Sequence, residues 1–284
     1  MKRWMWLGLA PVVVAALLAA RVQRPELPDE ATDRHVDKAL PQSPQTGQHY
    51  IAQKDDGEWG TVKGQIVWGG DKLPERTEIN VGDNPDKEHC LSKGKLYDEK
   101  WTVNKENKGV RWVFVWLQPE GSGTMPIHPK LDKPEQAEVT FDQPCCQFVE
   151  HAFAMRVGQV LIAKNSAPVA HNVKWFNDKN GEGNVLVRAG GSLKLMTVKP
   201  SNRPLSLDCN IHTWMHCWVR IFDHPYYAVT DADGKFEIKL APAGKYRLVV
   251  WHEEGWGPPG TKDGNPVTIK GETDVGKIVL GPSK

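Results

Sequence analysis

Features that mark several protein classes are scarce in this sequence of 284 residues. The formal net charge is only +1, and no long run of lysine or arginine occurs. This argues against nucleic acid as a partner, because phosphate binding needs a clustered basic surface. After residue 20, no segment keeps an apolar stripe at helical spacing for three turns, which argues against a helical bundle.

What the chain does contain is short β-type runs and many aromatic side chains. Twelve tryptophans favour an aromatic-rich β core. Glycine, proline and asparagine separate the apolar runs at the spacing of a β-sandwich. One run, residues 110–117, is apolar almost throughout, which predicts a strand covered on both faces. Residues 155–165 read as a single further strand. The sequence therefore predicts an all-β fold.

The last third alternates more regularly. Phe236, Ile238 and Leu240 share one face, and alternation resumes after a turn at residues 242–244. This pattern predicts a hairpin, preceded by a tight turn at Asp233 and Gly234. We expect residues 225–281 to form a small sandwich completed by strands from residues 60–117. The expectation fails if those N-terminal strands pair only with the segment in between.

The first twenty residues have the organisation of an export signal. Lys2 and Arg3 precede an apolar stretch over residues 4–18, and two alanines follow at 19 and 20. This pattern predicts a cleaved secretory signal, with an uncleaved membrane anchor as the alternative. Residues 21–58 are polar without an apolar period and predict a disordered linker. Either way we expect an exported, periplasmic or extracytoplasmic protein.

The most informative motif is Cys209, His212 and Met215 at the spacing C-x2-H-x2-M, with His171 and Asn172 upstream. A thiolate and two imidazoles supply a trigonal plane for a mononuclear copper ion, and a thioether binds weakly on the axis. Asn172 can pin the two ligand loops by hydrogen bonds. Taken one at a time, His171 would more often be a structural or surface histidine, Met215 a residue of the apolar core, and Cys209 part of a disulfide. Together they predict one bound copper ion.

The same residues favour copper over other metals. Zinc takes cysteine and histidine but rarely a thioether, so Met215 favours copper. His212 and His216 stand four residues apart and could bridge a different ion, but surface exposure is the better explanation. His151 and His224 have no assigned role.

The number of cysteines is odd, at five. Thiols outside the cytoplasm normally oxidise unless a metal holds them. If Cys209 binds metal, the remaining four allow three pairings. A bridge between the adjacent Cys145 and Cys146 would strain its backbone, so long-range pairs are favoured. Cys90 with Cys146 is our first choice, and burial as small apolar residues is the alternative.

At these residues the chain resembles a known family. The segment HNV at His171, together with CNIHTWM at Cys209, is similar to the type 1 blue copper proteins, the cupredoxins. The short ligand loop is closest to the amicyanin and plastocyanin kind. The longer segment from CNIHTWM to VVWH resembles bacterial methylamine-utilisation or plastocyanin-like proteins. In those proteins a cupredoxin-like domain adjoins a carboxypeptidase-regulatory-like, or prealbumin-like, sandwich. The resemblance implies a Greek-key cupredoxin sandwich with His171, Cys209, His212 and Met215 as ligands.

The predicted organisation has five parts. They are a signal or anchor (1–20), a linker (21–58), an N-terminal β region (59–136), a cupredoxin-like copper domain (137–224) and a carboxypeptidase-regulatory-like β domain (225–284).

Electron transfer is the predicted function. His212 would face solvent as the exit for the electron, and Trp214 would belong to an apolar docking patch for a cytochrome or another exported oxidoreductase. The alternative is an exported protein that stores or delivers copper. A multicopper enzyme is disfavoured because no His-x-His pair is present. An adhesion module would leave the ligand residues unexplained. We expect membrane contact only through an uncleaved N-terminus.

Overall fold

The computed structural model describes residues 59–177, 179–258 and 260–281. The predicted signal or anchor and the predicted linker lie outside these residues. The described residues belong to one compact unit. Within the described ranges, no helix has the length and apolar character needed to cross a membrane. Helical structure there amounts to α1 (Lys87–Cys90) and a 3-10 turn (Pro129–Leu131), so the fold is all-β, as predicted.

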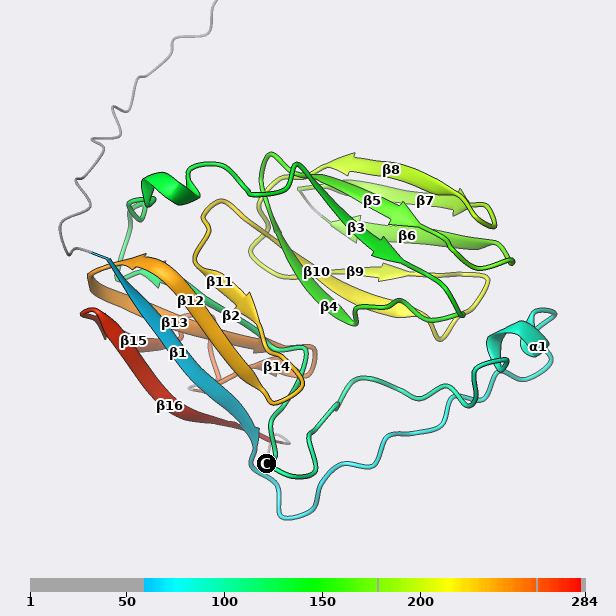
Figure 1. Ribbon diagram of the computed structural model, residues 1–284, viewed down its shortest axis with the longest axis horizontal. Coiled ribbons are helices and arrows are strands. Elements are labelled where there is room, and N and C mark those ends of the chain that lie inside the picture. Colours follow the sequence, from blue (N-terminus) through cyan, green and yellow to red (C-terminus); the bar gives the residue numbers. More distant parts are fainter. Residues whose placement is uncertain (1–58, 178, 259, 282–284) are drawn as a thin grey trace, which may run out of the picture. The chain divides into compact units, whose positions relative to one another are not determined.

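The first and last strands build one two-sheet unit, which we call the terminal sandwich. Its strands are β1 (Trp59–Trp68), β2 (Phe114–Pro119), β11 (Tyr227–Val229), β12 (Lys235–Pro242), β13 (Gly244–His252), β14 (Gly255–Trp256), β15 (Asn265–Ile269) and β16 (Glu272–Leu280). One sheet has the order β12-β1-β16, and the other has β11-β2-β13-β14 with β15 beside β13. Figure 1 shows blue β1 running between orange β12 and red β16. The N-terminal strands therefore pair with strands that follow residue 225.

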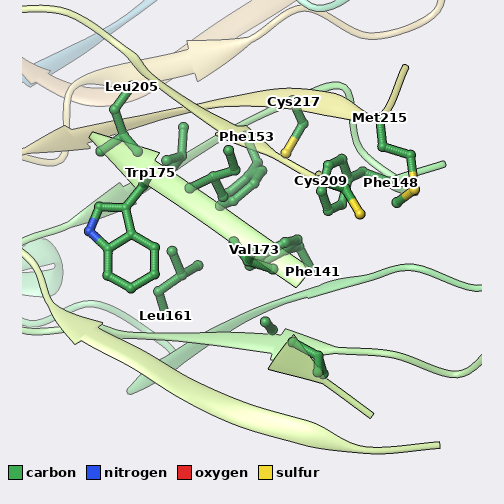
Figure 2. Close-up of a cluster of buried hydrophobic side chains, with 14 of the residues drawn as sticks. Phe141, Phe148, Phe153, Leu161, Val173, Trp175, Leu205, Cys209, Met215 and Cys217 are labelled. Carbon is green, nitrogen blue, oxygen red and sulfur yellow. The ribbon is translucent and has the colours of Figure 1, made fainter. Parts of the chain in front are cut away.

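The intervening strands build a second unit, which we call the site sandwich. Its strands are β3 (Glu138–Asp142), β4 (Ala152–Arg156), β5 (Val160–Lys164), β6 (His171–Asn177), β7 (Gly181–Val187), β8 (Ser192–Thr197), β9 (Leu205–Asp208) and β10 (His216–Phe222). Their sheets have the orders β4-β10-β9-β6-β7 and β3-β5-β8. The core between them includes Phe141, Leu161, Val173 and Leu207, all at most 1% exposed. Figure 2 shows part of this core.

Strand β2 is buried on both faces, as its composition predicted. Val115 and Leu117 belong to the core of the terminal sandwich. Phe114 and Trp116 lie in a separate aromatic cluster that also includes Phe222 of β10. The strand begins later than expected, because Trp112 adopts a φ of 69° and interrupts the extended backbone before Phe114.

The predicted hairpin over β12 and β13 is wrong. β12 pairs with β1, whereas β13 pairs with β2, β14 and β15, so the turn at residues 242–244 carries the chain from one sheet to the other. Ile238 and Leu248 nevertheless share one core. Alternation reports only which residues face a core, and two strands in opposing sheets face it as well as two partners in a hairpin do.

The single strand predicted over residues 155–165 is also wrong. It is two strands, β4 and β5, in different sheets of the site sandwich. A turn closed by the Gln159 N–H donating to the Arg156 carbonyl (3.2 Å) separates them, and Gly158 takes a φ of 94° within it. Glycine is suited to this backbone conformation because it has no Cβ to clash.

The predicted turn at Asp233 and Gly234 is confirmed. The Gly234 N–H donates to the Asp231 carbonyl at 3.0 Å, and Gly234 has a φ of 73°. A Cβ at this position would also collide with the carbonyl oxygen of Ile66 in β1. Two independent requirements, positive φ and close backbone approach, therefore demand glycine here.

Candidate metal centre

The candidate ligands come from two neighbouring strands of the site sandwich and the loop between β9 and β10. His171 is the first residue of β6, and Cys209 directly follows β9. Residues 209–215, the ligand loop, close on themselves. The Cys209 N–H donates to the Met215 carbonyl at 3.1 Å, and the Met215 N–H donates to the His212 carbonyl at 2.8 Å. The loop is thus a compact turn between two paired strands rather than a long excursion.

The structure brings three of the predicted ligands together. The Nδ1 atoms of His171 and His212 are 3.0 Å apart, and both side chains are fully buried. The donor atoms of His171, Cys209 and His212 all lie within 4.8 Å of one another. Two nitrogens that share one ion at bond lengths of about 2 Å are separated by about this spacing. The arrangement therefore fits one metal ion between two imidazoles and a sulfur.

Met215, the fourth predicted ligand, lies in the same buried core as Cys209 and is 2% exposed. Figure 2 draws both sulfur-bearing side chains at one end of that core, near Phe148. A buried thioether beside a thiol is consistent with a weak axial donor.

Asn172 connects the two ligand-bearing segments. Its Oδ1 accepts hydrogen bonds from the backbone N–H groups of Asn210 (2.7 Å) and Ile211 (3.2 Å), and from the Cys209 thiol at 3.3 Å. Its Nδ2 donates to Asn184 of β7 at 2.7 Å. The His212 N–H points at the Cys209 sulfur at 3.4 Å. Asn172 therefore holds β6, the ligand loop and β7 together around the Cys209 sulfur.

Burial favours the metal-binding protonation state of both histidines. It is the main cause that lowers the pKa of His171 to about 4, with His212 and His89 adding to the shift. Burial also lowers the pKa of His212, although Asp86 opposes the shift. A neutral imidazole offers a lone pair to an ion without first losing a proton.

One part of the site was not predicted from the sequence. Residues 77–98 form a loop that we call the cover loop, closed by Ile79 N–H to Leu96 carbonyl and Asp98 N–H to Thr77 carbonyl bonds, both 2.9 Å. Asp86 in this loop lies 3.2 Å from Nε2 of His212. A separation of 126 residues in sequence hides this pair from any local pattern.

The cover loop also corrects the expectation that His212 faces solvent. The side chain is fully buried. Asn84 of the cover loop donates to the Ile211 carbonyl at 3.0 Å, which holds the cover loop against the ligand loop. No pattern in the sequence predicts that this segment packs over the ligand loop.

A disulfide joins Cys90 of the cover loop to Cys146, with the Cα atoms 5.2 Å apart. This is the pair favoured from the sequence. The indole N–H of Trp214 donates to the Cys146 carbonyl at 2.9 Å, which leaves Trp214 half-buried. The disulfide sulfurs also lie near His212, but sulfurs bonded to each other are not thiolate donors. Cys145, Cys209 and Cys217 are free thiols.

Comparisons with known proteins identify structural similarities only. No family model matches the chain, and no curated protein matches it. An oxidised mutant of amicyanin shares 15% identity over 32% of this chain and 88% of its own, with a TM-score of 0.27. A purple cupredoxin from Nitrosopumilus maritimus shares 14% identity over 29% of this chain and 98% of its own, with a TM-score of 0.25. A reduced mutant of amicyanin covers 38% of this chain and 98% of its own at 14% identity and a TM-score of 0.28. At these scores, the chemistry of the site has to be judged from its own residues.

Proposed function

We propose that this chain is an exported mononuclear type 1 copper protein that carries single electrons between redox partners. The observation that carries the proposal is the convergence of the buried His171 and His212 Nδ1 atoms with the Cys209 sulfur. Met215 would complete the set as axial ligand. A thiolate, two imidazoles and a thioether form a soft donor set that favours copper over zinc. The bound ion would supply one-electron chemistry by alternating between Cu(II) and Cu(I).

The protein's contribution would be a rigid and dry ligand set. β6, β9 and β10 are neighbours in one sheet, and Asn172 ties the ligand loop to β6. Ligands fixed in this way change little between oxidation states, which keeps electron transfer fast. The four candidate ligands are all at most 3% exposed, which limits the access of bulk water to the ion.

We propose that a redox partner docks on the ligand-loop side. In the ligand loop, Ile211 is 37% exposed and Trp214 is half-buried. Both lie within three residues of His212, so a partner on this patch would approach a ligand imidazole. Small apolar patches suit transient redox encounters. The partner would be a cytochrome or another exported oxidoreductase, and we propose no enzymatic activity for this chain.

Export is supported by the disulfide as well as by the sequence of residues 1–20. Disulfides persist outside the cytoplasm and are rare within it. The bond between Cys90 and Cys146 therefore suits a periplasmic or extracytoplasmic protein.

A spectroscopic and electrochemical experiment tests the proposal. Protein without residues 1–20 is loaded with Cu(II). An intense visible thiolate charge-transfer band, narrow parallel hyperfine splitting in EPR and a reversible one-electron wave are expected. Cys209→Ser should abolish the band, whereas Cys145→Ser, which alters another free thiol, should keep it. A colourless copper complex would contradict the proposal.

The same preparation separates electron transfer from copper delivery. An electron carrier retains its copper in both oxidation states when a Cu(I) chelator is added. Rapid loss of Cu(I) to the chelator would instead identify a copper-handling protein with the same ligands.

A further inference from the structure

A second group of metal-binding side chains lies outside the candidate copper centre. It consists of His151, which precedes β4, His216, the first residue of β10, and Glu253, which follows β13. Their donor atoms lie within 4.8 Å of one another. The two histidines belong to the site sandwich, and the glutamate belongs to the terminal sandwich. We propose that these three residues bind a divalent transition-metal ion of the Zn²⁺ kind.

The geometry directs both imidazoles at the same carboxylate. Nε2 of His151 lies 2.6 Å from Oε1 of Glu253, and Nε2 of His216 lies 3.5 Å from Oε2. The rings are in edge-to-face contact, with centroids 5.0 Å apart. Because Nε2 of each histidine faces the carboxylate of Glu253, one ion can contact all three side chains. Two imidazoles and a carboxylate form a well-established donor set for such ions.

Burial and hydrogen bonding hold the carboxylate in place. The side chains of His151 and Glu253 are only 4% and 8% exposed. The indole N–H of Trp218 donates to Oε2 of Glu253 at 3.1 Å. Such an outer hydrogen bond orients a ligating carboxylate. Burial alone would raise the pKa of Glu253, but hydrogen bonds from His151 and His216 outweigh it and lower the pKa, so the group stays ionised.

An adjoining cavity supplies an entry path and a second carboxylate. The cavity has a volume of about 180 Å³, and its lining includes His151, His216, Glu99 and Met215. Burial raises the pKa of Glu99, while the nearby His151 and His216 oppose that shift. Glu253 supplies one negative charge to a bound ion, which offsets part of the cost of burying that ion. The cavity leaves room for water at an open coordination position.

The bound ion would link the two sandwiches, since its ligands come from both. Binding would stabilise the folded chain according to the ion's concentration and affinity. This site uses none of the ligands of the candidate copper centre, so it stands whether or not that centre binds copper.

The test is a titration of Cys209→Ser protein with Zn²⁺, followed by calorimetry and by the thermal unfolding midpoint. The serine weakens the candidate copper centre as a competitor for zinc. We expect one tight site and a rise in the midpoint. Adding Glu253→Gln should lower the affinity by at least about 100-fold, and so should His216→Gln, which alters a more exposed residue and guards against misfolding.

Glu254→Gln is the matched control. Glu254 neighbours Glu253 but is 47% exposed and paired with Lys100, so zinc affinity should stay unchanged. Absence of a tight site in Cys209→Ser protein would overturn the proposal. So would zinc binding that survives both Glu253→Gln and His216→Gln, and the cluster would then be an ion pair only.

Discussion

The two sandwiches of this chain are built from similar strands but use their interiors differently. The terminal sandwich has an apolar core in which Ile66, Ile238 and Leu248 are at most 2% exposed. The core of the site sandwich includes Cys209 and Met215, and His171 and His212 are fully buried beside it. Buried polar groups lower stability unless they are paired. A ligand that binds them should therefore stabilise the site sandwich far more than the terminal sandwich.

The cysteines are also distributed unequally between the two sandwiches. All five cysteines lie in the site sandwich or in the segments that pack on it, and the described residues of the terminal sandwich contain none. The terminal sandwich relies on apolar burial, whereas the site sandwich combines burial with a covalent cross-link and a candidate metal centre. Substitutions inside the core of the terminal sandwich should therefore leave the candidate metal centre unchanged.

The largest expected effect comes from the disulfide. Replacing Cys90 and Cys146 together by alanine should lower the free energy of unfolding by about 4 kcal/mol, because the bond closes a long loop in the unfolded chain. Its sequence separation is 56 residues. Denaturant unfolding of the metal-free protein measures the change. Cys145→Ala, which alters a free thiol, serves as the control. Equal stability of the double variant and wild type would contradict the expectation.

A core substitution in the terminal sandwich should give the converse result. Ile238→Ala removes a buried side chain and should cost about 3–4 kcal/mol, while the copper spectrum stays unchanged. Lys239→Ala, at an adjacent residue whose side chain is 69% exposed, should be nearly neutral. Loss of the visible band in folded Ile238→Ala protein would show that the two sandwiches are not independent in this respect.

The pH dependence of the metal-free protein should reflect His171. Burial holds the folded-state pKa at about 4 from a usual value of 6.5. As the pH falls, His171 therefore takes up a proton in the unfolded chain before it does so in the folded chain. The free energy of unfolding thus decreases between pH 6.5 and about pH 4. The loss should be about 2–3 kcal/mol. His171→Gln should remove that part of the slope in denaturant melts, and an unchanged slope would refute the assignment.

The smallest effect concerns the cover loop. Asp86→Asn should weaken the carboxylate's support of the His212 imidazole and lower Cu(II) affinity about tenfold. With Cu(I) affinity unchanged, the midpoint potential would rise by about 60 mV. Asp83→Asn, at an exposed position of the same loop, is the control for the removed charge. Voltammetry of the two variants measures the difference, and equal potentials would exclude a role for Asp86.

The sequence was informative where the chemistry is local. The ligand loop spans only residues 209–215, so the spacing of its residues largely determines how close their side chains lie. His171 begins β6, which lies two places from β10 in the same sheet. The all-β fold and the two-faced burial of β2 followed from composition and periodicity.

Contacts between distant segments could not be predicted in this way. Asp86 is 126 residues from His212, and Glu253 is 102 residues from His151, so no spacing links either pair. The same limit explains the burial of His212, which depends on where the cover loop packs. For β12 and β13, the apolar pattern identified the buried faces correctly, but it could not distinguish a hairpin from a crossing between sheets.

X-ray absorption spectroscopy of the copper-loaded protein tests the central claim most directly. It should detect one short copper–sulfur bond together with two imidazole nitrogens, and Cys209→Ser should remove the short sulfur contact. A copper ion surrounded only by nitrogen and oxygen in the unaltered protein would contradict the account.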